Sequence, residues 1–439
     1  MDYYLKPLKE LIKFKTISTD SDYKEEIEKC VNWYQNLFED NGFVVEIVRG
    51  YSNPIILAKY DNNSEQTALI YGHYDVQPAG NEKDWDSIPF ELSERDNRLY
   101  ARGIIDNKGQ SFVHIATVLN LIKNEQLGQN VTFLLEGGEE IGSPGVANFL
   151  TDYKEKLSAD YIVISDGTMI EDYPVLEVGL RGIMNLTVKV FTSDRELHSG
   201  LFGGAAPNAS HELVNVLSKL YDDNKLVNMN GFYTGVEEPT EQELENNKTI
   251  PYSFEEFHKL SGTKKNISED GVDFYTQTGL RPTVQITGIE SGYNGEGYKS
   301  GIPNAAIVKL NIRLVASQDP IKVKESIVQF FSNNLAEYAD FEIVHSDDEG
   351  SVPAVKIDTD NEYVQKAITI LEEVYQKKVL RKYVGGTIPL VYHIEKILSI
   401  PQVIVPLVNP DSNMHSVNEN YDLSYLKKAL EFSNNLFKK

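Results

Sequence analysis

The N-terminal part of the chain, to about residue 180, alternates strand-length apolar runs with amphipathic stretches of helix length. Continuous apolar runs indicate strands buried on both faces, whereas apolar residues three and four positions apart indicate helices. The expected strands are 43–48, 54–60, 67–72, 130–136 and 161–166. The expected helices are 4–15, 23–41, 109–124 and 144–156. This order predicts an α/β unit with a largely parallel sheet flanked by helices.

The pattern changes near residue 180. Three segments alternate apolar and polar positions, as half-buried strands do: 182–192, 283–291 and 305–316. Helices are expected at 208–221 and 320–338, a long polar excursion at 225–280, and closing segments at 341–347 and 352–358. Helices packed on one antiparallel sheet predict an α+β unit.

The helix–strand alternation returns near residue 358. It comprises a helix at 360–377, a segment at 379–390, a strand at 402–408 and a final helix at 422–437. A chain of 439 residues is too long for one ordinary core. The simplest layout is therefore one α/β domain, 1–179 with 358–439, interrupted by an inserted α+β domain at 180–357.

Composition narrows the class of protein. The longest apolar runs are strand-sized and fall short of the roughly 20 residues that cross a bilayer, and the N-terminus lacks a signal-peptide pattern. A formal net charge of −24 disfavours nucleic acid and anionic membranes as partners. Cys30 is the only cysteine, which rules out an intramolecular disulfide and a thiolate metal cluster. We expect a cytoplasmic protein.

Potential metal ligands follow several expected strands. In open α/β sheets, ligands bind outside the carboxyl ends of the strands, so we expect these side chains to meet at one edge. They are His73 and Asp75 after 67–72, Glu139 and Glu140 after 130–136, Asp166 after 161–165, and His415 after 402–408. Asp106 lies in a loop on the same side, just before the helix that begins near Gly109.

This donor set contains imidazoles and carboxylates but no sulfur. It suits zinc, with manganese and cobalt as alternatives, better than copper or a redox cluster. Five ligands exceed the needs of one catalytic zinc, whereas two ions about 3.5–4 Å apart would use all of them. The distribution suggests His73 and Asp166 on one ion, Glu140 and His415 on the other, and Asp106 between them.

The stretch EGGEEIGS, residues 136–143, has two readings. An isolated Glu-Glu pair is usually a polar surface turn, and a strand-terminal Asp is often only a helix cap, so the metal hypothesis rests on several groups converging. If Glu140 binds metal, Glu139 beside it is free to take a proton from water and deliver it to a leaving amine. Gly137 and Gly138 would let the chain turn tightly there. Asp75, two residues after His73, would orient that imidazole.

These residues lie in motifs of a known family. The chain resembles the dinuclear-zinc metallopeptidases that include carnosinase-like dipeptidases, glutamate carboxypeptidase, aminoacylase, and acetylornithine and succinyl-diaminopimelate deacylases. The matching stretches include GHYDVQP, ARGIIDNKG, EGGEEIGSPG, ISDG, LHSGLFGG, VGGTIP and NMHSVNE, and they span nearly the whole chain. The stretch SGYNGEGYKSGIPNAA and the long insertion before it are most similar to the dipeptidase branch.

The resemblance implies the metal roles given above, Asp75 as orienting residue and Glu139 as general base. It also implies a cis peptide bond between Asp106 and Asn107. The inserted domain would be a lid and dimerisation module. His198 would reach the active site of the partner subunit and stabilise the oxyanion there.

The resemblance also implies substrate-binding residues. Arg313 would bind the substrate carboxylate, a task that suits a guanidinium. Ser300 stands where relatives often have Thr, and Gly385, Gly386 and Thr387 match a substrate-binding turn. Many relatives have Arg-Glu before that turn, where this chain has Tyr383 and Val384. This departure leaves substrate preference open.

The expected function is hydrolysis of the peptide bond of short peptides, most of all dipeptides with a free C-terminal carboxylate, by a homodimer. An N-acyl amino acid deacylase is the alternative, because the motifs do not separate the two. An inactive binding protein is more remote, since no ligand or base is missing. The other five histidines are expected on helix or strand surfaces: His114, His211, His258, His345 and His393.

Overall fold

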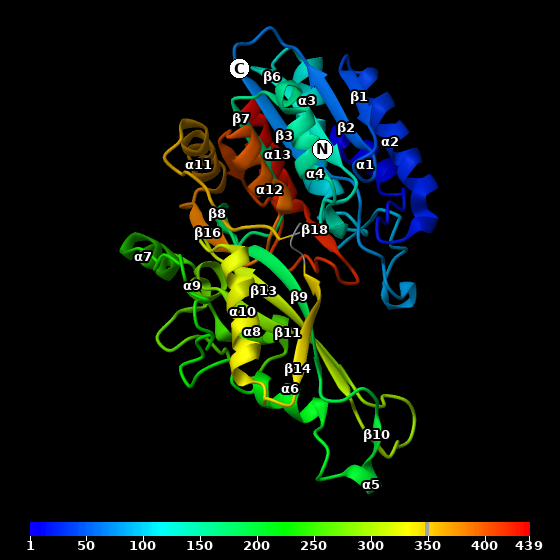
Figure 1. The fold of residues 1–439 in the computed structure, drawn as a ribbon. Coiled ribbons are helices and arrows are strands. Elements are labelled where there is room, and N and C mark those ends of the chain that lie inside the picture. Colours follow the sequence, from blue (N-terminus) through cyan, green and yellow to red (C-terminus); the bar gives the residue numbers. More distant parts are fainter. Residues whose placement is uncertain (347–350) are drawn as a thin grey trace.

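The computed structural model describes residues 1–346 and 351–439. Figure 1 shows two lobes joined by several chain segments. The upper lobe holds both ends of the chain, and the middle of the sequence forms the lower lobe. Within the described ranges, no helix has the length and apolar character needed to cross a membrane.

The upper lobe is built on a six-stranded sheet. Its strands lie in the order β1 (Val44–Val48), β2 (Ile55–Tyr60), β6 (Asn130–Glu136), β3 (Thr67–His73), β7 (Tyr161–Ile164) and β17 (Gln402–Ile404). The pairs β6–β3, β3–β7 and β7–β17 are parallel, whereas β1 and β2 run antiparallel to their neighbours. The connection from β1 to β2 is too short for the crossover that parallel strands require. The α/β expectation is confirmed, with an antiparallel edge.

Helices cover both faces of this sheet. One face carries α1 (Asp2–Leu11), α2 (Lys24–Glu39), α3 (Lys108–Lys123), α11 (Glu362–Tyr375) and α13 (Leu423–Phe437), and the other carries α4 (Val146–Asp152) and α12 (Pro389–His393). Successive side chains of β3 enter opposite cores, Ala68 and Ile70 the first and Leu69 and Tyr71 the second. This two-sided burial explains why the strand reads as a continuous apolar run.

The lower lobe is an α+β layer. Its antiparallel sheet has the order β11 (Thr283–Ser291), β13 (Ala305–Leu314), β9 (Gly182–Phe191) and β14 (Asp340–Ser346). The helices α6 (Ala209–Leu217) and α10 (Pro320–Asn334) contribute to its core. Burial alternates along β9, as the sequence pattern predicts. Of the expected segment 341–347, Asp347 lies outside the described residues.

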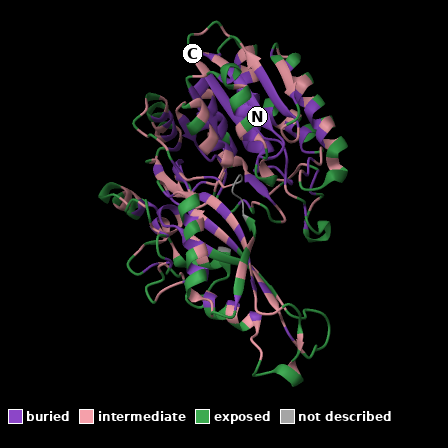
Figure 2. Ribbon diagram, in the orientation of Figure 1, coloured by how far each residue is buried: buried purple, intermediate pink, exposed green. Residues whose placement is uncertain are grey.

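A projecting arm extends the lower lobe. We use this name for the strand pair β10 (Leu197–His198) and β12 (Gly301–Ile302) together with the short helix α5 (Ser199–Phe202). Figure 1 shows β10 and α5 at the end of the molecule farthest from the upper sheet. In Figure 2 this end is mostly exposed, whereas the strands of the upper sheet are mostly buried.

A three-stranded sheet lies where the lobes meet, in the order β15 (Val355–Lys356), β8 (Val175–Leu180) and β16 (Leu380–Val384). Strand β8 was not expected from the sequence. The segment expected at 352–358 contacts both sheets: Val352 forms a bridge with Ile183 of β9, whereas β15 pairs with β8. The helices α7 (Glu241–Thr249) and α9 (Phe274–Leu280) of the polar excursion pack on β16; α8 (Phe254–Ser261) lies between them in sequence. The domain boundaries at 179/180 and 357/358 stay a prediction.

Candidate metal centre

The expected ligands gather at the carboxyl edge of the upper sheet. His73 is the last residue of β3, Glu139 and Glu140 follow β6, and Asp166 follows β7. Asp106 precedes α3, and His415 lies in the loop between β17 and β18 (Asn420–Asp422). Two groups of potential ligand atoms form there, each with all atoms within 4.8 Å of one another: His73, Asp106 and Asp166, and Asp106, Glu140 and His415.

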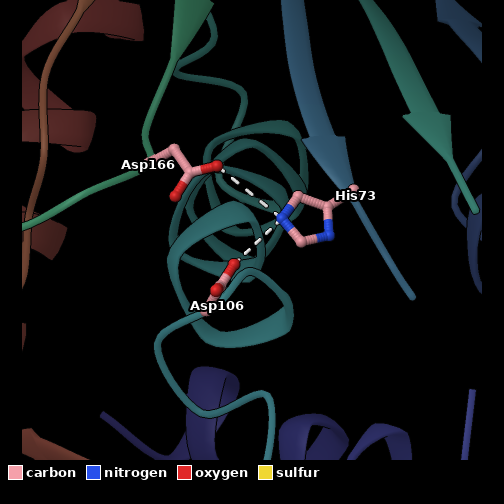
Figure 3. Close-up of side chains that lie close together, drawn as sticks. All are labelled: His73, Asp106 and Asp166. Atoms are coloured by element: carbon pink, nitrogen blue, oxygen red, sulfur yellow. Dashed lines mark ion pairs between the residues drawn. The ribbon is translucent and has the colours of Figure 1, made fainter. Parts of the chain in front are cut away.

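The first group surrounds one nitrogen of His73. Its Nε2 atom lies 3.0 Å from Asp106 Oδ1 and 3.6 Å from Asp166 Oδ2. Figure 3 shows both carboxylates directed at this nitrogen. The atom is fully buried and makes no hydrogen bond of acceptable geometry within the described structure. A buried polar atom without a partner needs an explanation, and a metal ion supplies one.

The other nitrogen of His73 is fixed by Asp75. Nδ1 lies 3.1 Å from the backbone oxygen of Asp75 and 3.4 Å from its Oδ1. Nδ1 therefore donates a hydrogen bond to Asp75, which orients the imidazole so that Nε2 faces the site. Burial lowers the pKa of His73, but the carboxylates of Asp106, Asp166 and Asp75 outweigh it and raise the pKa well above its ordinary value. Such a concentration of negative charge favours a cation.

The second group shares Asp106 with the first. His415 Nε2 lies 2.7 Å from Asp106 Oδ2 and 3.4 Å from Glu140 Oε2. Asp106 therefore presents one oxygen to His73 and the other to His415, the arrangement of a carboxylate between two sites. Both oxygens of Glu140 accept hydrogen bonds from Gln77, at 3.1 Å from its backbone nitrogen and 2.8 Å from its side chain. The sequence interpretation assigned no role to Gln77.

The Glu139–Glu140 turn is held by Asp75. The buried carboxylate of Asp75 accepts hydrogen bonds from the backbone nitrogens of Glu139, at 3.2 Å, and Glu140, at 3.1 Å. It thus ties the turn to the His73 imidazole. Burial raises the pKa of Glu139 well above its ordinary value; the positive charge of His73 opposes this, and nearby carboxylates add to it. Glu139 is therefore a carboxylate that readily accepts a proton.

The two glycines before this turn are needed because there is no room for a side chain, not because of their backbone conformation. A Cβ atom on Gly137 would lie 2.2 Å from the hydroxyl oxygen of Tyr74, and one on Gly138 would lie 2.7 Å from the hydroxyl of Ser52. The φ angle of Gly138 is −143°, which other residues also adopt. The reason is thus close packing, not the backbone freedom that the sequence suggested.

A buried ion pair connects the loops of the site. Arg102 Nη1 lies 2.7 Å from Glu419 Oε2, and both side chains are buried. The Glu419 carboxylate also accepts hydrogen bonds from the backbone nitrogens of Ile105, at 2.9 Å, and Asp106, at 3.3 Å. Arg102 Nη2 donates to the backbone oxygens of Pro78 and Ser416. The pair therefore joins the loops that carry Asp75, Asp106 and His415.

Sequence reasoning missed both residues of this pair. Each stands inside a quoted motif, Arg102 in ARGIIDNKG and Glu419 in NMHSVNE. The sequence signal that could have identified them is a charged residue within a few positions of a candidate ligand, Arg102 before Asp106 and Glu419 after His415. The peptide bond between Asp106 and Asn107 is cis, as the resemblance predicted.

Four of the expected substrate residues come together. Arg313 Nη1 donates to Thr387 Oγ1 at 3.0 Å, and Thr387 follows Gly385 and Gly386 in the turn after β16. A further residue, Arg181, joins them: its Nε donates to the backbone oxygen of Gly385 at 3.2 Å, and Thr387 Oγ1 donates to its backbone oxygen.

Two expected residues lie elsewhere. His198 belongs to the projecting arm, and the backbone nitrogen of Ser199 donates to the backbone oxygen of Ser300 at 3.1 Å. Within one chain, His198 therefore lies beside Ser300. Its strand β10 is far from β3 and β7, whose carboxyl ends carry candidate metal ligands (Figure 1).

His114 corrects another expectation. It is fully buried rather than on a helix surface, between the hydroxyls of Ser165, at 2.8 Å, and Ser433, at 3.0 Å. Helix α3 is buried over most of its length, so a histidine on it has no exposed face to occupy. Burial lowers the pKa of His114 to about 3.

An α/β sheet whose carboxyl edge collects two imidazoles and several carboxylates has the arrangement of a metal-dependent hydrolase. The chain belongs to Peptidase family M20/M25/M40, whose family model matches residues 69–439. This confirms the resemblance to metallopeptidases.

Three relatives illustrate the likeness. The Beta-Ala-His dipeptidase of Mus musculus is 32% identical over 372 residues, which cover 83% of this chain and 75% of that protein. The "Probable di- and tripeptidase DUG2" of Saccharomyces cerevisiae is 28% identical over 99% of this chain, which spans only 50% of that relative. The crystal structure of the M20 family metallo-carboxypeptidase Sso-CP2 from Sulfolobus solfataricus superposes with a TM-score of 0.86 at 28% identity, covering 99% of this chain and 98% of that one.

Proposed function

We propose that this protein hydrolyses the peptide bond of short peptides, above all dipeptides with a free C-terminal carboxylate, with two divalent cations. The observation that carries the proposal is Asp106, whose two carboxylate oxygens face His73 and His415 separately. A single carboxylate between two ligand groups is what a pair of adjacent ions needs.

The residues present fit such a pair. His73 and Asp166 would hold one ion, Glu140 and His415 the other, with Asp106 shared. Imidazole and carboxylate ligands without sulfur suit zinc, with manganese and cobalt as alternatives, better than copper or a redox cluster. When bound, the ions polarise the scissile carbonyl and make the attacking water more acidic.

Glu139 moves the proton in this proposal. It takes one from the attacking water and delivers it to the nitrogen of the leaving amine. Its raised pKa favours its acting as a proton acceptor and then as a donor. Asp75 keeps both glutamates in place through their backbone nitrogens, so that Glu140 binds metal while Glu139 stays free.

Arg313 and the turn 385–387 would hold the substrate carboxylate. A guanidinium binds a carboxylate in a bidentate manner, and Thr387 fixes the position of this one. The relatives support short peptides as substrates: one is named a dipeptidase and another a metallo-carboxypeptidase.

A homodimer would complete the site. His198 Nδ1 accepts a hydrogen bond from the backbone nitrogen of Gly200 at 3.0 Å, so its Nε2 carries the proton and is free to stabilise an oxyanion. The projecting arm exposes Leu201 and Phe202, at 77% and 44%. An exposed apolar arm that ends in a potential oxyanion donor suits insertion into a second subunit, with the lower lobe as an inserted lid and dimerisation domain. A cytoplasmic location, favoured by the single cysteine, stays part of this proposal.

Product analysis by mass spectrometry tests the function. Zinc-loaded protein receives a mixed pool of dipeptides, tripeptides and N-acyl amino acids, with a chelated sample as control. We expect chelator-sensitive loss of dipeptides. Loss of the N-acyl amino acids alone would replace the proposal with the deacylase alternative, and no turnover of any substrate would contradict both.

A further inference from the structure

Two arginines beside the turn 385–387 have no acidic partner among the described residues. Arg181 donates from Nε to Gly385 and from Nη1 to the backbone oxygen of Arg281 at 3.1 Å, and Arg313 donates to Thr387. Across residues 1–346 and 351–439, neither guanidinium forms an ion pair. Arg281 offers the contrast, because it pairs with Glu269 at 2.7 Å and Glu238 at 3.1 Å.

The electrostatics of the two arginines are unfavourable without an anion. Burial, together with the positive charge of Arg313, lowers the pKa of Arg181 to about 10, and burial lowers that of Arg313. Both side chains are partly buried, and charges withdrawn from water are normally paired. This chain has 66 acidic residues against 42 basic ones. Acidic residues are therefore abundant, yet within residues 1–346 and 351–439 none forms an ion pair with either arginine. An anion from outside the chain would do so.

A purely structural role for Arg181 explains only part of the position of its guanidinium. Its bond to the Arg281 carbonyl places a cation at the end of α9, where it is favourable. That role occupies Nε and Nη1 but leaves Nη2 without a hydrogen-bond partner in the described structure. A Cβ atom on Gly385 would lie 2.8 Å from Nη2, so the glycine keeps the space beside this atom open.

The neighbouring residues position the two arginines without neutralising their positive charges. Thr387 Oγ1 contacts both, accepting from the Arg313 guanidinium and donating to the Arg181 backbone oxygen. The backbone nitrogen of Arg181 donates to the oxygen of Val384 at 3.0 Å, and Val384 brings no charge to the turn. The hydroxyl of Tyr383 donates a hydrogen bond to Glu243 at 2.9 Å. This carboxylate is therefore bound to Tyr383 rather than to either arginine.

We propose that Arg181 and Arg313 together bind two carboxylates of one substrate, so that the enzyme prefers dipeptides whose C-terminal residue is Asp or Glu. Arg313 takes the main-chain carboxylate, as in the proposed function, and Arg181 takes the side-chain carboxylate, each in charge-assisted hydrogen bonds. A substrate with one carboxylate would leave the partly buried Arg181 unpaired. This inference rests on the proposed function and names its substrate class.

Paired substrates of equal shape test the inference. The kcat/KM is measured for Gly-Glu against Gly-Gln and for Gly-Asp against Gly-Asn on metal-loaded wild-type protein. We expect a preference for the acidic member of about ten- to a hundredfold, as one additional charge-assisted hydrogen-bonded pair provides. Arg181→Gln should bring the ratio near one while Gly-Gln is still hydrolysed, and Arg181→Lys should keep part of it.

A matched control separates a specific contact from general attraction. Arg381→Gln removes a positive charge from β16 without touching the turn, and it should leave the ratio unchanged. Equal kcat/KM values for the acidic and amide peptides in the wild type would overturn the inference and leave the proposed function intact. Failure to hydrolyse any dipeptide would overturn the function itself. If Arg181→Gln does not fold, the wild-type ratio and Arg181→Lys decide the question.

Discussion

The guanidinium of Arg102 and the carboxylate of Glu419 lie 2.7 Å apart inside the upper lobe, both almost completely shielded from solvent. The pair binds neither substrate nor metal in the proposed mechanism, yet it fixes the loops of Asp75, Asp106 and His415 relative to one another. One buried ion pair thus holds together three loops of the candidate site.

Glu419→Gln is expected to destabilise the fold by about 3–5 kcal/mol, because it leaves Arg102 buried without a counter-charge. Denaturant unfolding measures this, and metal content measured in parallel should fall, since Asp106 loses its backbone support. A double variant, Arg102→Met with Glu419→Gln, should recover part of the lost stability. An equal free energy of unfolding for the wild type and Glu419→Gln would show that the ion pair does not stabilise these loops.

Glu139→Gln is expected to lower kcat by about 10²–10⁴-fold with metal content unchanged, because it removes the proton acceptor but keeps the shape of the side chain. Steady-state kinetics and elemental analysis of the same sample measure this. Glu136→Gln is the matched control: Glu136 is buried nearby and accepts bonds from Tyr71 and Ser143 at 2.6 and 3.0 Å, but it has no part in the proposed chemistry. Comparable losses in both variants would argue against a specific role for Glu139.

Asp106→Ala and Asp166→Ala should differ in metal stoichiometry. Asp106 faces both ligand groups, so its loss should weaken both ions, whereas loss of Asp166 should affect only the ion beside His73. Calorimetric titration of chelated protein with zinc reports the number of sites. Equal stoichiometry for the two variants would contradict the assignment of Asp106 as the shared ligand.

Mixed dimers test the placement of His198. Glu139→Gln and His198→Gln should each be nearly inactive alone. In a dimer of one subunit of each kind, one site has an intact Glu139 and receives an intact His198 from its partner. Random reassociation should therefore restore about a quarter of wild-type activity, as expected for a symmetric dimer. No recovery despite confirmed mixed dimers, or a single-chain mass by light scattering, would contradict the arrangement.

Stability should fall on acidification through His114. Its pKa in the folded protein is about 3, below the ordinary value of 6.5, so the unfolded chain binds a proton that the folded chain does not. This contribution is complete above about pH 6.5 and is lost as the pH falls, by about 2 kcal/mol between pH 7 and pH 5. Unfolding of chelated protein at several pH values measures it. His114→Gln should show a shallower decline, and parallel curves would contradict the assignment.

From the sequence alone we could predict the α/β and α+β layers and the group of candidate ligands at the sheet edge. Continuous apolar runs such as β3 and alternating ones such as β9 follow directly from burial on two faces or one, and parallel strands bring their carboxyl ends to one edge. The pattern could not reveal β8, its pairing with β15 and β16, the burial of His114, or the meeting of Arg102 with Glu419. These depend on contacts between residues far apart in the chain. They follow only from the folded structure, because local periodicity indicates which side chains face inward but not which residues they contact there.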